Sequence, residues 1–306
     1  MIKEKFDGMS ILNELGKKLN LVLKHFDLRL DRIGDEKISI NDYSYFPKTR
    51  SWLETVGIST LQEQLIQDEP AFADILLSFS QYSECFEAIP LYNNGDDTCP
   101  YWINDWLPGL DAVSIYGLLA TNNPSVYFEI GSGISTMFAK RAIEDHYLST
   151  RIMSLDPEPR ASIDVICDDL IRLPCEEVPI SLFENLPGDM VFFVDSSHRA
   201  FQNSDVTVFF TEILPSLPEG CVWGLHDIEL PYDYKSDVRD RYYNEQYLLA
   251  AYLLGGGGDD NIHLPNAFIS SRLKLVNIIR ENIFTSKYFD GVKKHGTCFW
   301  MTRECS

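Results

Sequence analysis

Short apolar runs alternate with longer amphipathic runs over the second half of the chain. The apolar runs predict strands at residues 126–130, 151–155, 162–166, 190–194 and 221–225, with residues 268–270 and 297–302 closing the sheet. Helices are predicted at residues 112–120, 135–146, 204–214 and 244–254, and four glycines at 255–258 predict a loop. This alternation predicts a doubly wound, mostly parallel, seven-stranded α/β sheet, a Rossmann-like fold.

The first 110 residues do not show that alternation. Helical stripes of apolar residues are predicted at 10–26 and 71–82, separated by segments rich in aromatic and turn-forming residues. We therefore predict a mainly helical segment over residues 1–110, acting as a cap or a homo-oligomer contact, and an α/β domain over residues 111–306. The aromatic run at 100–106 either packs between these parts or forms a wall of the substrate pocket.

Composition narrows the classes of partner. Acidic side chains outnumber basic ones by 46 to 26, so the formal net charge is −20. Such a protein repels phosphate backbones and anionic membranes, which favours a small-molecule substrate and excludes nucleic acid and membrane partners. The seven cysteines form no C-x-x-C pair, and we see neither a signal segment nor an apolar run of about 18 residues. We expect free thiols and a cytoplasmic location.

Acidic or polar residues follow the predicted strands directly. They stand at residues 129–133, 156–160, 195–198 and 226–227. Packing does not require an aspartate immediately after an apolar strand. Ligands of doubly wound sheets bind outside the carboxyl ends of the strands, where the strand order reverses. The sequence therefore predicts a ligand site at this edge of the sheet.

A glycine turn and a later aspartate indicate which kind of ligand binds there. Gly131 and Gly133 would let the backbone approach a ligand closely, and the helix that follows points its amides at the same place. Asp156 follows Gly133 by 23 residues, at the end of the second strand, where a carboxylate can accept two hydrogen bonds from a ribose diol. A structural turn and a helix cap are the alternatives, but the pair together favours a nucleoside.

The run at 128–136, Phe-Glu-Ile-Gly-Ser-Gly-Ile-Ser-Thr, resembles motif I of the class I S-adenosylmethionine-dependent methyltransferases. More closely, the chain resembles a bacterial branch related to cephalosporin-hydroxylase-like proteins and macrolide sugar O-methyltransferases. Supporting runs stand at 156–160, 193–198, 226–228 and 243–247. The resemblance spans residues 100–302 and leaves out the first hundred.

The resemblance implies where S-adenosylmethionine would bind. The glycine turn would hold its methionine end, Asp156 its ribose and the region of Asp168 its adenine, with Asp195 beside the transferred methyl group. The complete set of implied cofactor-binding residues is Glu129, Gly131, Ser132, Gly133, Asp156, Pro157, Asp168 and Asp195.

The resemblance also implies a candidate metal site. In metal-using relatives, an acidic residue after the fourth strand joins an acidic pair after the fifth, and here that pair is His226-Asp227. Asp195, His226 and Asp227 could therefore ligate a divalent metal such as magnesium or manganese. Magnesium accepts mostly oxygen ligands, while an imidazole shifts the preference toward manganese, iron or zinc. Whether a metal binds stays open at this point.

We predict that His198 and Asp195 are the catalytic residues. A hydroxyl acceptor is a poor nucleophile until its proton is removed, and a neutral imidazole titrates in the right range for a base. A structural hydrogen bond from His198 to a loop carbonyl is the alternative.

The predicted function is methyl transfer from S-adenosylmethionine to a hydroxyl of a small molecule, a sugar or a natural product. One alternative is a nicotinamide-dependent oxidoreductase on the same scaffold, although Thr136 replaces the third glycine of a dinucleotide fingerprint. Another alternative is a non-catalytic cofactor-binding module that serves a partner through its first hundred residues.

Overall fold

The computed structural model describes residues 18, 51–159, 162–235, 238, 241–258 and 260–304. Residues 51–306 form one compact unit, and residues 1–50 are grouped apart from it. The predicted boundary at residue 110 falls inside the compact unit, because apolar side chains from before and after residue 110 share one core. Except for residue 18, the helix predicted at 10–26 lies outside the described residues. The role predicted for residues 1–110 stays a prediction.

Helices dominate the described part of the chain before residue 123. They are α2 (Val56–Gln67), α3 (Glu69–Phe79), η2 (Ser80–Tyr82), α4 (Ser83–Glu87) and α5 (Gly109–Asn122). α3 buries Phe72, Leu76 and Phe79, the spacing of one helical face, and it contacts α5. The helices predicted at 71–82 and 112–120 are thus confirmed.

The described residues form a seven-stranded sheet. Its strands are β1 (Val126–Ile130), β2 (Arg151–Leu155), β3 (Asp169–Ile171), β4 (Val191–Val194), β5 (Val222–Leu225), β6 (Asp260–Pro265) and β7 (Phe299–Arg303). Their order is β3-β2-β1-β4-β5-β7-β6, and β7 runs in the direction opposite to the other six strands. The predicted doubly wound, mostly parallel fold is confirmed. The strand order reverses between β1 and β4, so a crevice is expected at their carboxyl ends.

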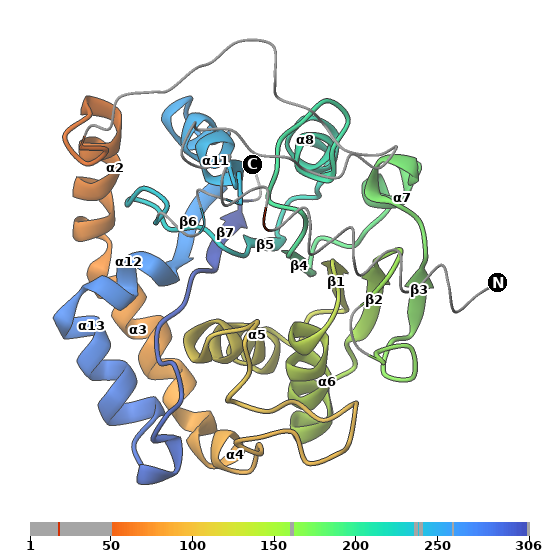
Figure 1. The fold of residues 1–306 in the computed structure, drawn as a ribbon, viewed down its shortest axis with the longest axis vertical. Coiled ribbons are helices and arrows are strands. Elements are labelled where there is room, and N and C mark those ends of the chain that lie inside the picture. The colour runs from red at the N-terminus through yellow and green to blue at the C-terminus, as the bar shows by residue number, and fades with distance from the viewer. Residues whose placement is uncertain are drawn as a thin grey trace. The chain divides into compact units, whose positions relative to one another are not determined.

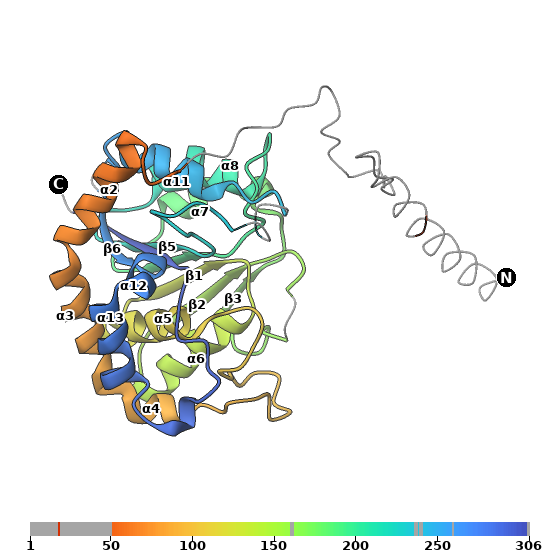
Figure 2. The same ribbon diagram turned by 60° about the vertical axis from the view of Figure 1, so that its left-hand side comes forward.

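Helices cover both faces of this sheet. α5 and α6 (Ile134–His146) lie on one side, and α7 (Ser181–Glu184), α8 (Asp205–Val208) and α11 (Glu245–Leu254) lie on the other (Figure 1 and Figure 2). β1 and β4 are buried along their whole length, as expected of parallel strands covered on both faces. The remaining elements are η3 (Cys175–Glu177), η4 (Phe209–Ile213), α9 (Leu214–Ser216), α12 (Asn266–Ser271), α13 (Leu273–Ile278), η5 (Ile279–Ile283) and η6 (Lys287–Phe289). None of the described helices combines the length and the hydrophobicity that crossing a bilayer requires.

Two predicted strands are wrong. Residues 162–166 form a turn that the Ile166 amide closes on the Ile163 carbonyl at 3.0 Å, and both side chains pack with Met137 in a small separate cluster. The strand in this region is the three-residue β3, which is too short for periodicity to reveal. Residues 268–270 lie in helix α12, where Phe268 and Ile269 are both fully buried although they are adjacent. Adjacent buried residues do not fit the alternation of a half-buried strand.

Candidate active site

A cavity of about 1180 Å³ lies at the carboxyl ends of β1, β2, β4 and β5. The loops that follow these four strands line it, at residues 130–133, 155–158, 195–198 and 226–227. Sites for one small molecule usually measure about 300–1,000 Å³. This cavity therefore has room for a cofactor together with a second substrate, at the edge of the sheet that the sequence predicted.

The turn after β1 can be built only with glycine at its first position. Gly131 has φ +79°, and a Cβ atom there would lie 1.9 Å from the Asp195 carbonyl oxygen. The backbones after β1 and β4 thus touch at this point. A Cβ atom on Gly133, in contrast, would have no neighbour within 4 Å among the described residues. Gly133 therefore leaves its part of the cavity wall open for a ligand.

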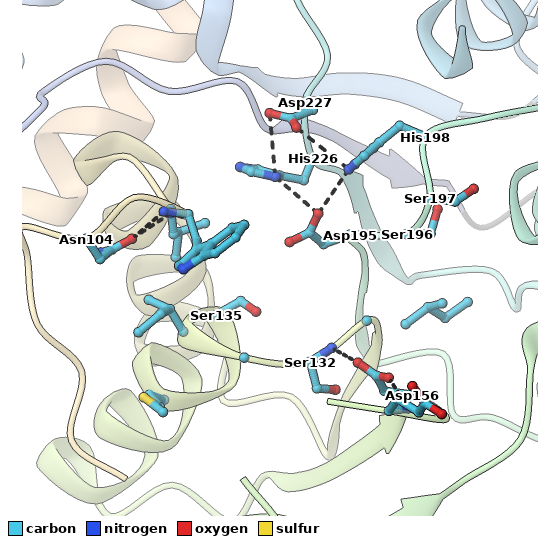
Figure 3. Close-up of a pocket in the computed structure, with 18 of the residues that line it drawn as sticks. Asn104, Ser132, Ser135, Asp156, Asp195, Ser196, Ser197, His198, His226 and Asp227 are labelled. Atoms are coloured by element: carbon cyan, nitrogen blue, oxygen red, sulfur yellow. Dashed lines mark hydrogen bonds and ion pairs between the residues drawn. The ribbon is translucent and has the colours of Figure 1, made fainter. Parts of the chain in front are cut away.

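The Asp156 carboxylate lies against this turn, as the sequence predicted (Figure 3). Its Oδ2 accepts a hydrogen bond of 2.8 Å from the Ser132 amide, and its Oδ1 accepts one of 2.8 Å from the Glu158 amide. A carboxylate oxygen has two lone pairs, so each oxygen can accept one more hydrogen bond from a ribose hydroxyl. Pro157, another predicted residue, also lines the cavity.

Glu129 does not line the cavity, although the resemblance implied contact with the cofactor. It is fully buried and accepts hydrogen bonds from the hydroxyls of Tyr127 and Thr136. The Thr136 hydroxyl in turn accepts one of 3.0 Å from the Gly133 amide. Glu129 therefore braces the glycine turn from behind. Burial raises its pKa from an ordinary 4.5 to about 7, although hydrogen bonds from its neighbours oppose the shift.

The Glu129→Gln variant is expected to lose part of the pH dependence of stability. Because its folded-state pKa is raised, Glu129 holds a stabilising proton at low pH, and that contribution is lost as the pH rises from about 4.5 to about 7. The free energy of unfolding should fall by about 1–3 kcal/mol more in the wild type than in the variant between pH 4.5 and 8. Urea unfolding at both pH values measures this difference. An equal fall in the free energy of unfolding in the wild type and in the variant would refute the prediction.

Asp168 also lies away from the cavity lining. It is exposed, and its Oδ2 accepts a hydrogen bond of 2.8 Å from the Ile152 amide at the edge of β2. Its carboxylate is used to extend the pairing of β2 with the chain that leads into β3. The structure therefore does not support the predicted role of Asp168 beside the adenine.

Asp195, His198, His226 and Asp227 form one cluster on the side of the cavity opposite Ser132 and Asp156 (Figure 3). Asp195 Oδ1 lies 3.2 Å from His198 Nε2 and 3.3 Å from His226 Nδ1. Asp227 lies 3.7 Å from each of the same two nitrogens, through Oδ2 and Oδ1 respectively. The structure thus joins the predicted catalytic pair to the predicted metal ligands.

Two buried carboxylates that the sequence analysis missed stand behind the histidines. Glu245 Oε2 lies 2.9 Å from His198 Nδ1, and Asp111 Oδ2 lies 3.5 Å from His226 Nε2. Both acids are fully buried near the start of a helix, α11 and α5 respectively. In the sequence, Glu245 has the appearance of a helix-capping residue. Asp111 interrupts the apolar run Leu110 to Val113, and a charged residue inside an apolar run is a signal that could have indicated a buried functional carboxylate.

The surrounding carboxylates favour the protonated form of both histidines, so an ion bound by these rings would have to displace a proton. Burial lowers the pKa of His198, but its hydrogen bonds with Asp195 and Glu245 outweigh that effect and raise the pKa to about 10. Burial likewise opposes the charge on His226, yet Asp227 and Asp195 raise its pKa well above the ordinary value. The two imidazoles conversely hold the pKa of Asp195 well below its usual range, against the effect of burial. His198 would have to lose a proton before it could act as the base that the sequence predicted.

The backbone is also unusual in this cluster. His198 has φ +60° and Asp227 has φ +54°, the left-handed region that residues other than glycine seldom adopt. Each conformation is held by a hydrogen bond to its carbonyl, from the Asn244 amide at 3.0 Å and from the Tyr234 hydroxyl at 2.9 Å. Backbone strain of this kind tends to gather at functional sites.

Aromatic residues complete the walls of the cavity. The Tyr243 ring lies between the His198 ring, at 4.5 Å, and the Arg241 guanidinium, at 4.7 Å. In the run at 100–106, Tyr101 and Trp106 line the cavity, while Trp102 is buried in the core. Both interpretations of that aromatic run are therefore realised, by different residues.

Comparison with known proteins agrees with this geometry. Residues 128–228 match the family model described as a methyltransferase domain. That segment runs from β1 to just past β5 and includes the glycine turn, Asp156 and the whole cluster of Asp195, His198, His226 and Asp227. None of the curated proteins matches the chain.

Several solved structures are similar in outline. A methyltransferase of Podospora anserina, PaMTH1, bound to S-adenosylhomocysteine, is 12% identical over 86% of this chain and 100% of its own, with a TM-score of 0.38. The plantazolicin methyltransferase BpumL, with the same ligand, is 12% identical over 80% and 100%, with a TM-score of 0.40. An O-methyltransferase from Bacillus cereus is 13% identical over 74% and 89%, with a TM-score of 0.37. At these TM-scores the similarities add nothing to the case for function.

The family match, the strand order and the glycine turn facing Asp156 agree with one another. Residues 128–228 therefore form a methyltransferase domain.

Proposed function

We propose that this methyltransferase domain uses S-adenosylmethionine and acts on a hydroxyl group of a small molecule, a sugar or a natural product. The observation that carries the proposal is the cluster of Asp195, His226 and Asp227 in the same cavity as the glycine turn and Asp156. A hydroxyl is a poor nucleophile toward a sulfonium until its proton is removed or its pKa is lowered. A cluster of carboxylates and imidazoles suits that requirement. The net charge of −20 favours an acceptor that is not an anion.

The two sides of the cavity have separate tasks in this proposal. On one side, the open face of Gly133 and the carboxylate of Asp156 would hold the amino-acid and ribose parts of the cofactor. When bound, S-adenosylmethionine supplies an electrophilic methyl group on a sulfonium. On the other side, Asp195 would face the acceptor, whose hydroxyl proton must leave as the new bond forms. Tyr101 and Trp106 supply apolar and aromatic surface for the body of the acceptor.

We propose that Asp195, His226 and Asp227 hold a divalent metal, magnesium or manganese. Ligand atoms held at about 2.1 Å from one ion lie roughly 3.0–3.4 Å apart. Asp195 Oδ1 and His226 Nδ1 lie 3.3 Å apart, which fits two ligands of one ion, whereas Asp227 lies 3.7 Å from that nitrogen and would have to move closer. A bound ion would lower the pKa of the acceptor hydroxyl.

Calorimetry with S-adenosylmethionine and S-adenosylhomocysteine tests the cofactor half of the proposal. Micromolar binding, roughly −8 kcal/mol, is expected. Asp156→Ala should weaken binding by about 10–100-fold, because it removes hydrogen bonds to a charged acceptor. Asp168→Asn serves as the matched control and should bind as the wild type does, because Asp168 lies outside the cavity lining. Unchanged affinity in Asp156→Ala would contradict the site.

Release of S-adenosylhomocysteine tests the acceptor half. The probes are a panel of monosaccharides and phenols, each paired with its methyl ether and with the corresponding amine. Turnover is expected for free hydroxyl compounds and not for their methyl ethers. Turnover of the amines alone would overturn the proposal of O-methylation.

We also propose a cytoplasmic location and association through residues 1–110. The six cysteines that the structure describes are free thiols, which suits a reducing compartment. Val56, Ile66 and Leu77 are exposed apolar side chains on α2 and α3, and a second copy of the chain could cover them. Light scattering of the full chain, alone and with Val56→Ser, tests the association.

A further inference from the structure

Both histidines of the cluster present one ring nitrogen to the cavity and the other to a buried carboxylate. His198 directs Nε2 toward Asp195 and Asp227, and Nδ1 toward Glu245. His226 directs Nδ1 toward the same two aspartates, and its Nε2 toward Asp111. Histidines that bind metal ions are characteristically oriented in this way, because a carboxylate on the far nitrogen fixes the tautomer and the ring plane.

The distances between the inward-facing atoms match a single ion. Asp195 Oδ1 lies 3.2 Å from His198 Nε2 and 3.3 Å from His226 Nδ1, and Asp227 lies 3.7 Å from each of those nitrogens. Ligand atoms around one ion lie roughly 3.0–3.4 Å apart. Asp195, His198 and His226 each offer one ligand atom, and these three atoms lie within 4.8 Å of one another. Asp227 faces the two nitrogens with different oxygens and would have to turn toward the ion to become its fourth ligand. The side chains of the two aspartates are about one third exposed, at 33% and 32%, so an ion can reach them from the cavity.

His198 is poorly placed to act as a base on the acceptor. Its side chain is only 5% exposed, and both ring nitrogens already face carboxylates, Nδ1 at 2.9 Å and Nε2 at 3.2 Å. A base must have a nitrogen directed at the proton that it removes. The inward-facing nitrogen points instead at the centre of the cluster, where it can donate a lone pair to an ion.

The buried carboxylates of Asp111 and Glu245 hold the two histidine rings in place and do not face the cavity. Asp111 accepts hydrogen bonds from the Asn266 side chain and from the amides of Thr297 and Cys298, so its oxygens are already occupied. Glu245 Oε1 is buried with no hydrogen-bond partner among the described residues, so its contact with His198 is the main compensation for a buried carboxylate. Neither acid lines the cavity.

We infer that His198 is a metal ligand, which completes a site of two imidazole nitrogens and two carboxylates with His226, Asp195 and Asp227, and that Glu245 and Asp111 position the two rings. This inference rests on the metal in the proposed function and extends it. Two imidazoles disfavour magnesium, which prefers oxygen ligands and keeps several waters. The site therefore selects a divalent transition metal such as manganese, iron, cobalt or zinc.

Metal binding to the full chain, stripped with a chelator, tests this directly. Calorimetry with Mn²⁺ and with Mg²⁺ should show one site that prefers Mn²⁺ by at least about 100-fold. Pulsed electron paramagnetic resonance of the Mn²⁺ complex should show couplings to two imidazole nitrogens. His198→Asn is the informative variant, because asparagine tolerates the left-handed backbone at this position. It should lose one of the two couplings and weaken Mn²⁺ binding by at least tenfold.

Two further variants make the outcome unambiguous. Glu245→Gln keeps the size of the side chain but removes the charge behind His198, and it should weaken Mn²⁺ binding by about 10–100-fold with both couplings kept. His295→Asn changes another histidine that lines the cavity, and it should leave both couplings and the affinity unchanged. Equal affinity for Mg²⁺ and Mn²⁺, or couplings unchanged by His198→Asn, would overturn the inference.

The failure of this inference can be told apart from the failure of the proposed function. Binding of S-adenosylmethionine to the same samples is measured in parallel, and His198→Asn should keep that affinity because His198 lies in the cluster opposite Asp156. A chain that binds the cofactor but no Mn²⁺ refutes the metal site alone. A chain that binds Mn²⁺ through two nitrogens but no S-adenosylmethionine supports the metal site and refutes the proposed function.

Discussion

The Asp195→Asn variant is expected to lower kcat/KM for methyl transfer by about 10²–10⁴-fold while S-adenosylmethionine still binds. Asp195 Oδ1 is the one oxygen that contacts both imidazoles of the described cluster. An amide in its place keeps the shape but cannot balance two imidazoles or bind an ion as a carboxylate does. The cluster would then lose its ability to activate the acceptor hydroxyl.

Release of S-adenosylhomocysteine with the best acceptor of the hydroxyl panel measures this loss. Glu158→Gln is the control, because Glu158 lines the same cavity but lies outside the cluster. Its kcat/KM should match that of the wild type. Wild-type activity in Asp195→Asn would mean that the cluster takes no part in the reaction.

The Gly131→Ala variant is expected to lose about 3–5 kcal/mol of stability, a large share of the roughly 5–15 kcal/mol that stabilises an ordinary domain. Its Cβ atom would lie 1.9 Å from the Asp195 carbonyl oxygen, at a φ of +79° that L-residues disfavour. The chain cannot move aside easily, because Ile130 pairs with Val194 and its carbonyl accepts from the Asp195 amide at 2.8 Å.

Gly133→Ala is the matched comparison, two residues away in the same turn. Its Cβ atom meets nothing within 4 Å among the described residues, so this variant should fold as the wild type does. The added methyl group would enter the cavity and should weaken S-adenosylmethionine binding at least tenfold. Thermal unfolding and calorimetry on both variants measure the pair. A Gly131→Ala variant as stable as the wild type, or a Gly133→Ala variant that binds S-adenosylmethionine with wild-type affinity, would contradict these roles of the glycine turn.

The pattern of apolar residues along the chain predicted the central strands of the sheet well. β1 and β2 begin and end where the apolar runs at 126–130 and 151–155 do, because turn-forming residues bound both runs. Pattern failed at residues 162–166 and 268–270, where isoleucine and phenylalanine are buried by a turn and by a helix. β-branched and aromatic residues favour strands only when their surroundings are pleated, and the neighbouring elements decide that.

The site was predictable where residues directly follow strands. Asp156, Asp195 and His226 line one cavity because parallel strands bring their carboxyl ends to one edge of the sheet. Asp111 and Glu245 were not found, because each meets its histidine through packing between helices and the sheet. His226 lies 115 residues from Asp111 in the sequence, and no local pattern encodes such a contact. Asp168 accepts a hydrogen bond from a backbone amide, a role that an acidic residue beside a strand can equally fill, and its place near the adenine stays a prediction.

A crystal structure of the protein with S-adenosylhomocysteine tests the central claim most directly. Both ribose hydroxyls are expected at roughly 2.6–3.2 Å from the Asp156 carboxylate, with the amino-acid end at the glycine turn and the sulfur facing Asp195. A ligand bound elsewhere, or a ribose beyond the reach of Asp156, would contradict it.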